Sequence, residues 1–153
     1  MRDARYLVCS LAVAGAVGLL SPLAVQAQSA AFIRECQQWI DKKGYSTDYI
    51  EQKLGKRQPG MASAWRGNVP VEEVRPGDVA LVGIRTRPDS QHVALVEEVH
   101  RGRDGLVTAV RVSEWNWGRY VDQGCLVTET FGRLAPERKI HLDAIRQVWR
   151  PDR

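Results

Sequence analysis

The sequence is poor in the residues that build metal sites and nucleic-acid surfaces. It has only three cysteines and three histidines among its 153 residues, and no spacing between them is that of a zinc site. The segment Gly102–Gly105 is too short and too poor in oxygen ligands for a calcium loop. Lys and Arg form no run, and the formal net charge is only +4. We therefore expect no metal, no other cofactor and no nucleic-acid partner.

Long apolar runs are also scarce, and the one present lies at the N-terminus. Residues 7–25 are rich in Ala, Val, Leu and Gly, follow two arginines, and end at Val25-Gln26-Ala27. This pattern is typical of a secretory signal peptide. A retained anchor is the alternative, because a span needs roughly 20 apolar residues; Pro22 and the cleavage-site pattern favour removal. We predict a signal peptide over 1–27, export to the periplasm or the extracellular space, and no membrane span thereafter.

The remaining chain, 28–153, is long enough for one compact domain and too short for two. It keeps two of the three cysteines, Cys36 and Cys125. Two cysteines in an oxidising compartment favour a disulfide. A free, reactive Cys36 is the other possibility, and the sequence around Cys36 supports it.

The segment 29–43 has the period of an amphipathic helix, which Gly44 ends. Its apolar residues recur every three or four positions, at Phe32, Ile33, Cys36, Trp39 and Ile40. Cys36 therefore lies on the buried side or near the start of this helix. A helix N-terminus carries partial positive charge, which favours a thiolate. On an apolar helix face, a small buried hydrophobe is the competing interpretation.

After short helical pieces and loops over 45–70, the pattern changes to strands. Arg75-Pro76-Gly77-Asp78 predicts a turn in which the Asp78 side chain binds backbone. An apolar run of strand length follows, and with the two segments after it predicts three strands. They are Val79 to Ile84, His92 to Val99, and Leu106 to Trp117. The last two form a hairpin with a connection of about five residues.

The hairpin brings candidate catalytic side chains together. If Val99 lies opposite Leu106, antiparallel pairing puts His92 opposite Ser113 or Glu114. Strand alternation puts Val110, Val112, Glu114 and Asn116 on one face, and Arg111, Ser113, Trp115 and Trp117 on the other. A register in which His92 shares the face of Glu114 and Asn116 gives its imidazole a carboxylate and an amide as neighbours. A cysteine nucleophile needs such a base, and the base needs a group that orients it.

Several segments, in this order, resemble the CHAP family of cysteine, histidine-dependent amidohydrolases and peptidases. They are Glu35-Cys36-Gln37-Gln38-Trp39, Ala62-Ser63-Ala64-Trp65, Arg75-Pro76-Gly77-Asp78-Val79-Ala80, His92-Val93-Ala94-Leu95-Val96 and Ser113-Glu114-Trp115-Asn116. The resemblance covers about Ile33 to Asn116. Gln91 departs from it, standing where the family usually has glycine, and the chain after Asn116 follows no family pattern.

The resemblance implies a role for each matched residue. Cys36 is the nucleophile, His92 the general base, Glu114 the group that orients His92, and Asn116 an auxiliary. It also implies an α+β, papain-like (NlpC-type) fold in which the N-terminal cysteine helix packs on an antiparallel sheet. The implied substrate is the peptide of peptidoglycan.

Three functions follow as expectations. The first is an exported peptidoglycan hydrolase, an N-acetylmuramoyl-L-alanine amidase or an endopeptidase, that forms an acyl-enzyme on Cys36. The second is a non-catalytic wall-binding or inhibitor module with a Cys36–Cys125 disulfide. The third is a secreted antibacterial amidase toxin. A thiol titration on folded, non-reduced protein separates the first from the second, since the first needs a free Cys36.

Overall fold

The computed structural model describes residues 36–85, 87–122 and 125–152; the predicted signal peptide lies outside these ranges. Within them the fold is α+β. Residues 36–41 are helical. The main helix is α2 (Ser46–Leu54), and three short 3₁₀ helices are η1 (Ala62–Ala64), η2 (Val71–Glu73) and η3 (Leu142–Ala144). The strands are β1 (Val79–Ile84), β2 (Arg87–Arg101), β3 (Val107–Ser113), β4 (Tyr120–Asp122), β5 (Val127–Thr128), β6 (Arg138–His141) and β7 (Ile145–Trp149).

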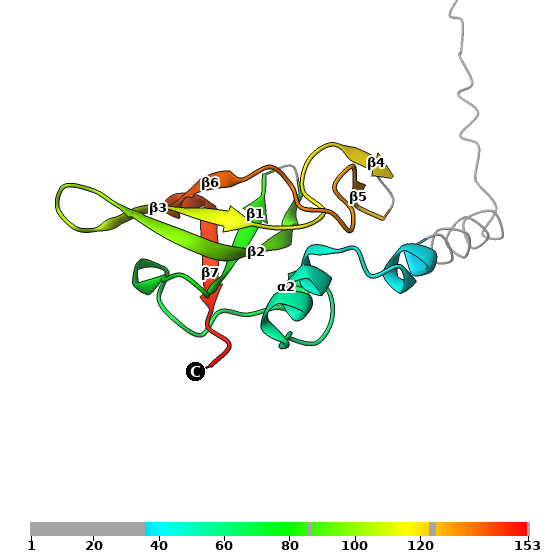
Figure 1. Ribbon diagram of the computed structural model, residues 1–153, viewed down its shortest axis with the longest axis horizontal. Helices are drawn as coiled ribbons and strands as arrows, with labels where there is room; N and C mark the ends of the chain where they lie inside the picture. Colours follow the sequence, from blue (N-terminus) through cyan, green and yellow to red (C-terminus); the bar gives the residue numbers. More distant parts are fainter. Residues whose placement is uncertain (1–35, 86, 123–124, 153) are drawn as a thin grey trace, which may run out of the picture.

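A five-stranded antiparallel sheet in the order β6-β3-β2-β1-β7 organises the molecule (Figure 1). The predicted strand Val79–Ile84 is confirmed as β1, whereas β2 extends beyond its predicted bounds at both ends. Strands β4 and β5 form a separate two-stranded ribbon. No helix in the described ranges is long and apolar enough to cross a membrane.

Helix α2 covers one face of the sheet. It begins where the Tyr45 backbone N–H donates to the Asp48 carboxylate (2.9 Å), and it ends at Gly55, whose φ of 65° is the left-handed conformation that glycine adopts readily. The apolar side of α2 packs with buried side chains of β1 and β2; this cluster contains Tyr49, Ile50, Ala62, Trp65, Val79, Leu81, Val93 and Leu95. The helical residues 36–41 lie apart from this face (Figure 1). The helix on the sheet is therefore α2, which corrects the prediction that the cysteine helix packs there.

The other face of the sheet holds a second apolar cluster. Its side chains come mainly from β1, β2, β3, β6 and β7, and they are predominantly valines: Val69, Val74, Ala80, Val82, Ala94, Val96, Val107, Val110, Val112, Ile140, Ile145 and Val148. The predicted alternation along the third strand is confirmed at Val110, Val112 and Glu114, all of which are buried. The Glu114 carboxylate therefore lies on the buried, apolar face of the sheet, where a charged group needs a partner.

The register of the hairpin differs from the prediction. Val99 pairs with Val110 instead of Leu106, because β2 continues to Arg101, which pairs with Val107. Two irregularities in this pairing, between Val96 and Glu98 and between His100 and Arg101, shift the register. Strand β3 consequently ends at Ser113, and the strand partner of His92 is Val82 on β1.

A buried ion pair fixes the turn before β1. The Asp78 carboxylate accepts two hydrogen bonds from Arg150 (both 2.8 Å) and one from the Arg75 backbone N–H (3.0 Å). Only 2% of the Asp78 side chain is exposed. The predicted role of Asp78 as a backbone-binding turn residue is confirmed. Asp78 has a second structural role as the ion-pair partner of Arg150.

We expect Asp78→Ala to lower the free energy of unfolding by about 3–5 kcal/mol, because it leaves the Arg150 charge without its partner. Asp152→Ala is the matched control, since it removes a carboxylate that is 80% exposed and paired with Lys56. That variant is expected to unfold like the wild type. Urea unfolding followed by circular dichroism measures both, and equal midpoints for the two variants would contradict the expectation.

Candidate functional site

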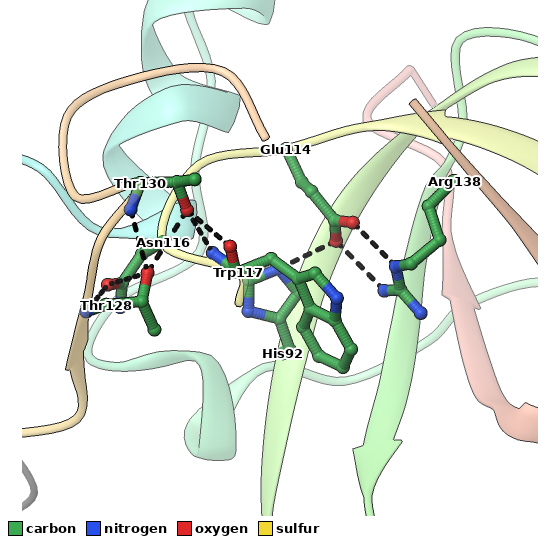
Figure 2. Close-up of polar contacts among 7 residues, drawn as sticks. All are labelled: His92, Glu114, Asn116, Trp117, Thr128, Thr130 and Arg138. Atoms are coloured by element: carbon green, nitrogen blue, oxygen red, sulfur yellow. Dashed lines mark hydrogen bonds and ion pairs between the residues drawn. The ribbon is translucent and has the colours of Figure 1, made fainter. Parts of the chain in front are cut away.

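The site is built around a buried histidine and carboxylate. His92 on β2 and Glu114, just past the end of β3, are 5% and 1% exposed. His92 Nε2 lies 2.9 Å from Glu114 Oε2, and the two side chains point toward each other (Figure 2). The contact is short but too bent for a good hydrogen bond, so it is best described as an ion-pair contact. The predicted proximity of His92 and Glu114 is confirmed, although the register that predicted it is not.

Arg138 on β6 completes this cluster from the opposite side. Its Nε donates to Glu114 Oε1 (2.8 Å) and its Nη2 to Glu114 Oε2 (3.1 Å), a two-pronged contact with the carboxylate. The guanidinium carbon also lies 3.7 Å from the ring centroid of Trp117. The Trp117 ring in turn packs on the His92 imidazole, with the centroids 5.1 Å apart. Trp117 thus shields the His92–Glu114–Arg138 cluster from solvent.

These contacts determine the charge of Glu114 and the proton position on His92. Burial raises the pKa of the Glu114 carboxyl, but the contacts with His92 and Arg138 lower it by more, so the pKa lies below its ordinary value. An ionised carboxylate only accepts hydrogen bonds, which assigns the proton of a neutral imidazole to Nε2. The lone pair then lies on Nδ1, which makes no hydrogen bond within the described residues. Nδ1 is therefore the nitrogen able to accept a proton.

His92 lines a pocket of about 290 Å³. The pocket lies between the first turn of α2, the short helix η1 and the loop after β3. Apolar and aromatic side chains form most of its wall. Arg85 is the only permanently charged residue among the described residues that line the pocket. The remaining lining residues are Tyr45, Ser46, Thr47, Met61, Ala62, Ser63, Ile84, Ser90, Gln91, Asn116, Trp117, Gly118, Tyr120, Leu126 and Thr128. A small polar or peptide group fits a concave site of this kind.

Cys36 is not part of this pocket. Its sulfur is bonded to that of Cys125, with the Cα atoms 5.1 Å apart. The disulfide packs with Tyr45 and Phe131; Tyr45 lines the pocket, whereas neither cysteine does. The predicted role of Cys36 as a free nucleophile is therefore corrected: the bridge leaves it no thiolate, and the structure does not bring it to the pocket that contains His92. The alternative with a Cys36–Cys125 bridge is the one that the structure contains.

Asn116 lines the pocket but does not orient His92. Its side-chain amide donates to the Leu126 carbonyl (2.9 Å), and its Oδ1 accepts from the backbone N–H (2.8 Å) and hydroxyl (3.1 Å) of Thr128. Figure 2 shows Asn116 turned toward Thr128 and away from the imidazole. Its φ of 57° ends the strand-like alternation, which is why Trp117 lies next to His92 instead of on the opposite face. Asn116 supports the pocket wall, and the predicted auxiliary contact with His92 is absent.

Gln91 has a structural role that the sequence did not indicate. Its side-chain amide donates to the carbonyls of Ala62 (2.6 Å) and Trp65 (2.9 Å). These bonds attach β2 to η1, beside the pocket. Glycine at this position could not make these hydrogen bonds, so Gln91, which departs from the CHAP pattern, holds the pocket wall in place.

Sequence reasoning missed two further residues of the site. Arg138 follows Glu114 by 24 positions, and no local pattern links the two. Ser46 lines the pocket as the first residue of α2, and it does have a signal: small polar residues and Asp48 precede Tyr49 and Ile50, as at a helix start. In the described chain, no three His, Cys, Asp or Glu side chains are grouped as metal ligands would be.

Comparisons of the chain with protein-family models, with curated proteins and with solved structures returned no match. The likeness to the CHAP family therefore rests on the sequence motifs alone.

Proposed function

We propose that this protein is an exported hydrolase that cleaves an amide bond in the peptide of peptidoglycan, in the pocket that His92 lines. The observation that carries the proposal is the buried His92–Glu114 pair at the edge of that pocket. A histidine whose second nitrogen is held by a carboxylate is the usual general base of acyl transfer. The proposal includes the papain-like fold that the CHAP resemblance implies.

The chemistry required of His92 is proton transfer at Nδ1. Glu114 keeps the proton of the neutral imidazole on Nε2. It also stabilises the positive charge that develops on the ring when Nδ1 takes up a proton. Arg138 keeps Glu114 ionised, and Trp117 excludes water from the pair. The group that attacks the carbonyl must come from the pocket, because the sulfur of Cys36 is bonded to Cys125.

Export is part of the same proposal. The predicted signal peptide and the Cys36–Cys125 disulfide both favour an oxidising compartment, which is where the cell wall is assembled and degraded. A housekeeping wall hydrolase and an antibacterial amidase toxin share this chemistry. We propose the hydrolase in general and assign neither biological role.

A second candidate function is a non-catalytic wall-binding or inhibitor module. The disulfide favours it, because a CHAP-like protein whose motif cysteine is oxidised has lost the nucleophile of that family. In this case the pocket binds a wall peptide without cleaving it. Retention on insoluble peptidoglycan without release of fragments is the expected behaviour.

The test is digestion of purified peptidoglycan by the wild type and by His92→Ala, with mass spectrometry of the soluble fragments. We expect the wild type to release fragments that carry a new amine and a new carboxylate, which also identifies the bond that is cut. The variant is expected to lose at least 10²-fold in rate, the typical contribution of a positioned base. His100→Ala, which removes a half-buried histidine outside the pocket lining, is the control. Identical fragments from wild type and His92→Ala would refute the proposal, and binding without fragments would favour the second candidate.

A further inference from the structure

We propose that Ser46 is the nucleophile of this site, in place of the disulfide-bonded Cys36. This inference rests on the proposed function for the reaction class, but it concerns a residue that the motif resemblance did not indicate. It makes the protein a serine hydrolase with a Ser46–His92–Glu114 constellation.

The position of Ser46 carries the inference. Ser46 is 5% exposed and lines the same pocket as His92, which is equally buried. Its hydroxyl makes no hydrogen bond within the described residues, and neither does His92 Nδ1. Neither atom is fully buried, so both are accessible from the pocket. The two unpartnered groups are the complementary donor and acceptor of a serine–histidine pair, and such pairs are often looser without substrate.

The start of α2 adds the electrostatic part of the site. The first N–H groups of a helix have no partner within the helix, and here these include the N–H groups of Ser46 and Thr47. The Tyr45 N–H, in contrast, is used by the Asp48 carboxylate. A helix of nine residues directs its partial positive charge toward this end. The same end therefore offers a nucleophile and donors for the oxyanion that forms when it attacks.

Other pocket residues fit the nucleophilic role less well. The Thr128 hydroxyl donates to Asn116, and Ser63 is exposed on η1. Thr47 is also buried, but its β-branched hydroxyl is more hindered, and it lies one position further into the helix. Ser46 is the residue that combines burial, an unpartnered hydroxyl and the first position of α2.

The reaction balances with the groups present and water. The Ser46 Oγ forms a bond to the amide carbon while its proton passes to His92 Nδ1. The C–N bond then breaks, and the imidazolium gives that proton to the leaving amine. Water attacks the ester, its proton passes to Nδ1, and the C–O bond to Ser46 breaks as that proton returns to Oγ. The products are a carboxylic acid and an amine.

The experiment combines covalent labelling with digestion. The full, non-reduced protein is incubated with a fluorophosphonate, and the modified residue is located by peptide mass spectrometry. We expect labelling at Ser46 in the wild type and at least a tenfold slower labelling in His92→Ala. Ser113→Ala is the control, because it removes a serine outside the pocket lining, and it is expected to be labelled like the wild type.

In the digestion assay, Ser46→Ala is expected to lower kcat by at least 10³-fold with little change in KM or in the thermal midpoint. Ser46→Cys is expected to recover part of the rate and to become sensitive to iodoacetamide, which a structural serine would not do. Digestion that persists in Ser46→Ala overturns the inference and leaves the proposed function intact. His92-dependent labelling of Ser46 without any digestion supports the nucleophile and overturns the peptidoglycan substrate. Neither labelling nor digestion overturns both.

Discussion

Glu114→Gln is expected to reduce the rate of peptidoglycan cleavage on the order of 10³–10⁴-fold while the protein remains folded. The side chain keeps its size, but an amide donates hydrogen bonds as well as accepting them. It therefore no longer assigns the proton to Nε2 of His92, and it no longer compensates the imidazolium charge. Initial rates of fragment release measure the effect. Glu98→Gln, which changes an exposed carboxylate of β2, is the control.

The same substitution has an expected signature in stability. Because the folded-state pKa of Glu114 lies below its ordinary value, ionised Glu114 stabilises the fold above the unfolded pKa of about 4.3, and this stability is lost as the pH falls through the folded pKa. At pH 7 the variant leaves Arg138 without a carboxylate, which we expect to cost about 3 kcal/mol.

Urea unfolding from pH 3 to pH 7 measures this dependence. The difference between wild type and Glu114→Gln is expected to start shrinking as the pH falls below the unfolded pKa of about 4.3, and to disappear only below the lower folded-state pKa. A difference that stays constant over the whole range would show that folding does not lower the pKa of Glu114. The Arg138→Met variant should approach the behaviour of Glu114→Gln, because it removes the other half of the same pair.

The sequence predicts the sheet better than it predicts how the strands align. A continuous apolar run was sufficient to find β1, which is buried on both faces, and alternation was sufficient to find the buried face of β3. The register was not predictable from the same signal. It depends on a tight turn in which the Gly102 N–H donates to the Leu106 carbonyl, and on bulges that leave the hydrophobic pattern nearly unchanged.

The candidate site was predictable to the extent that it depends on local alternation. His92 and Glu114 share a face and meet. Arg138 comes from β6, whose pairing with β3 is a long-range contact without a local sequence signal. Asn116 adopts a positive φ, so its side chain and that of Trp117 left the faces that alternation assigned to them.

The pairing of the cysteines is the clearest case of a choice that composition leaves open. Cys36 and Cys125 are 89 positions apart, and only the packing of Tyr45, Phe131 and Val127 around them indicates that they meet. The motif around Cys36 resembled a nucleophile segment, whereas the start of α2, ten positions later, is what lines the pocket.

Replacing both cysteines of the disulfide would abolish a mechanism that uses Cys36 but would leave Ser46 in place as a nucleophile. The Cys36→Ser/Cys125→Ser double variant is expected to lose about 2–5 kcal/mol of unfolding free energy, because an 89-residue loop is no longer closed in the unfolded chain. If Ser46 is the nucleophile, kcat is largely retained. KM is expected to rise modestly, since the Tyr45 hydroxyl donates to the Cys125 carbonyl (3.0 Å) directly beside Ser46. Urea unfolding and initial rates measure the two effects.

Reduction of the wild type with dithiothreitol gives the complementary result. A reduced bridge frees the Cys36 thiol, so a Cys36 mechanism predicts a gain of activity on reduction and none in the double variant. The Ser46 mechanism predicts no gain, because the attacking hydroxyl is present in both redox states, and the loosened contact between Tyr45 and Cys125 weakens substrate binding. A rise in wild-type activity with dithiothreitol, absent from the folded double variant, would return the nucleophilic role to Cys36. Activity that is equal or lower after reduction, and retained in the double variant, leaves the disulfide as a support for the pocket wall at the start of α2.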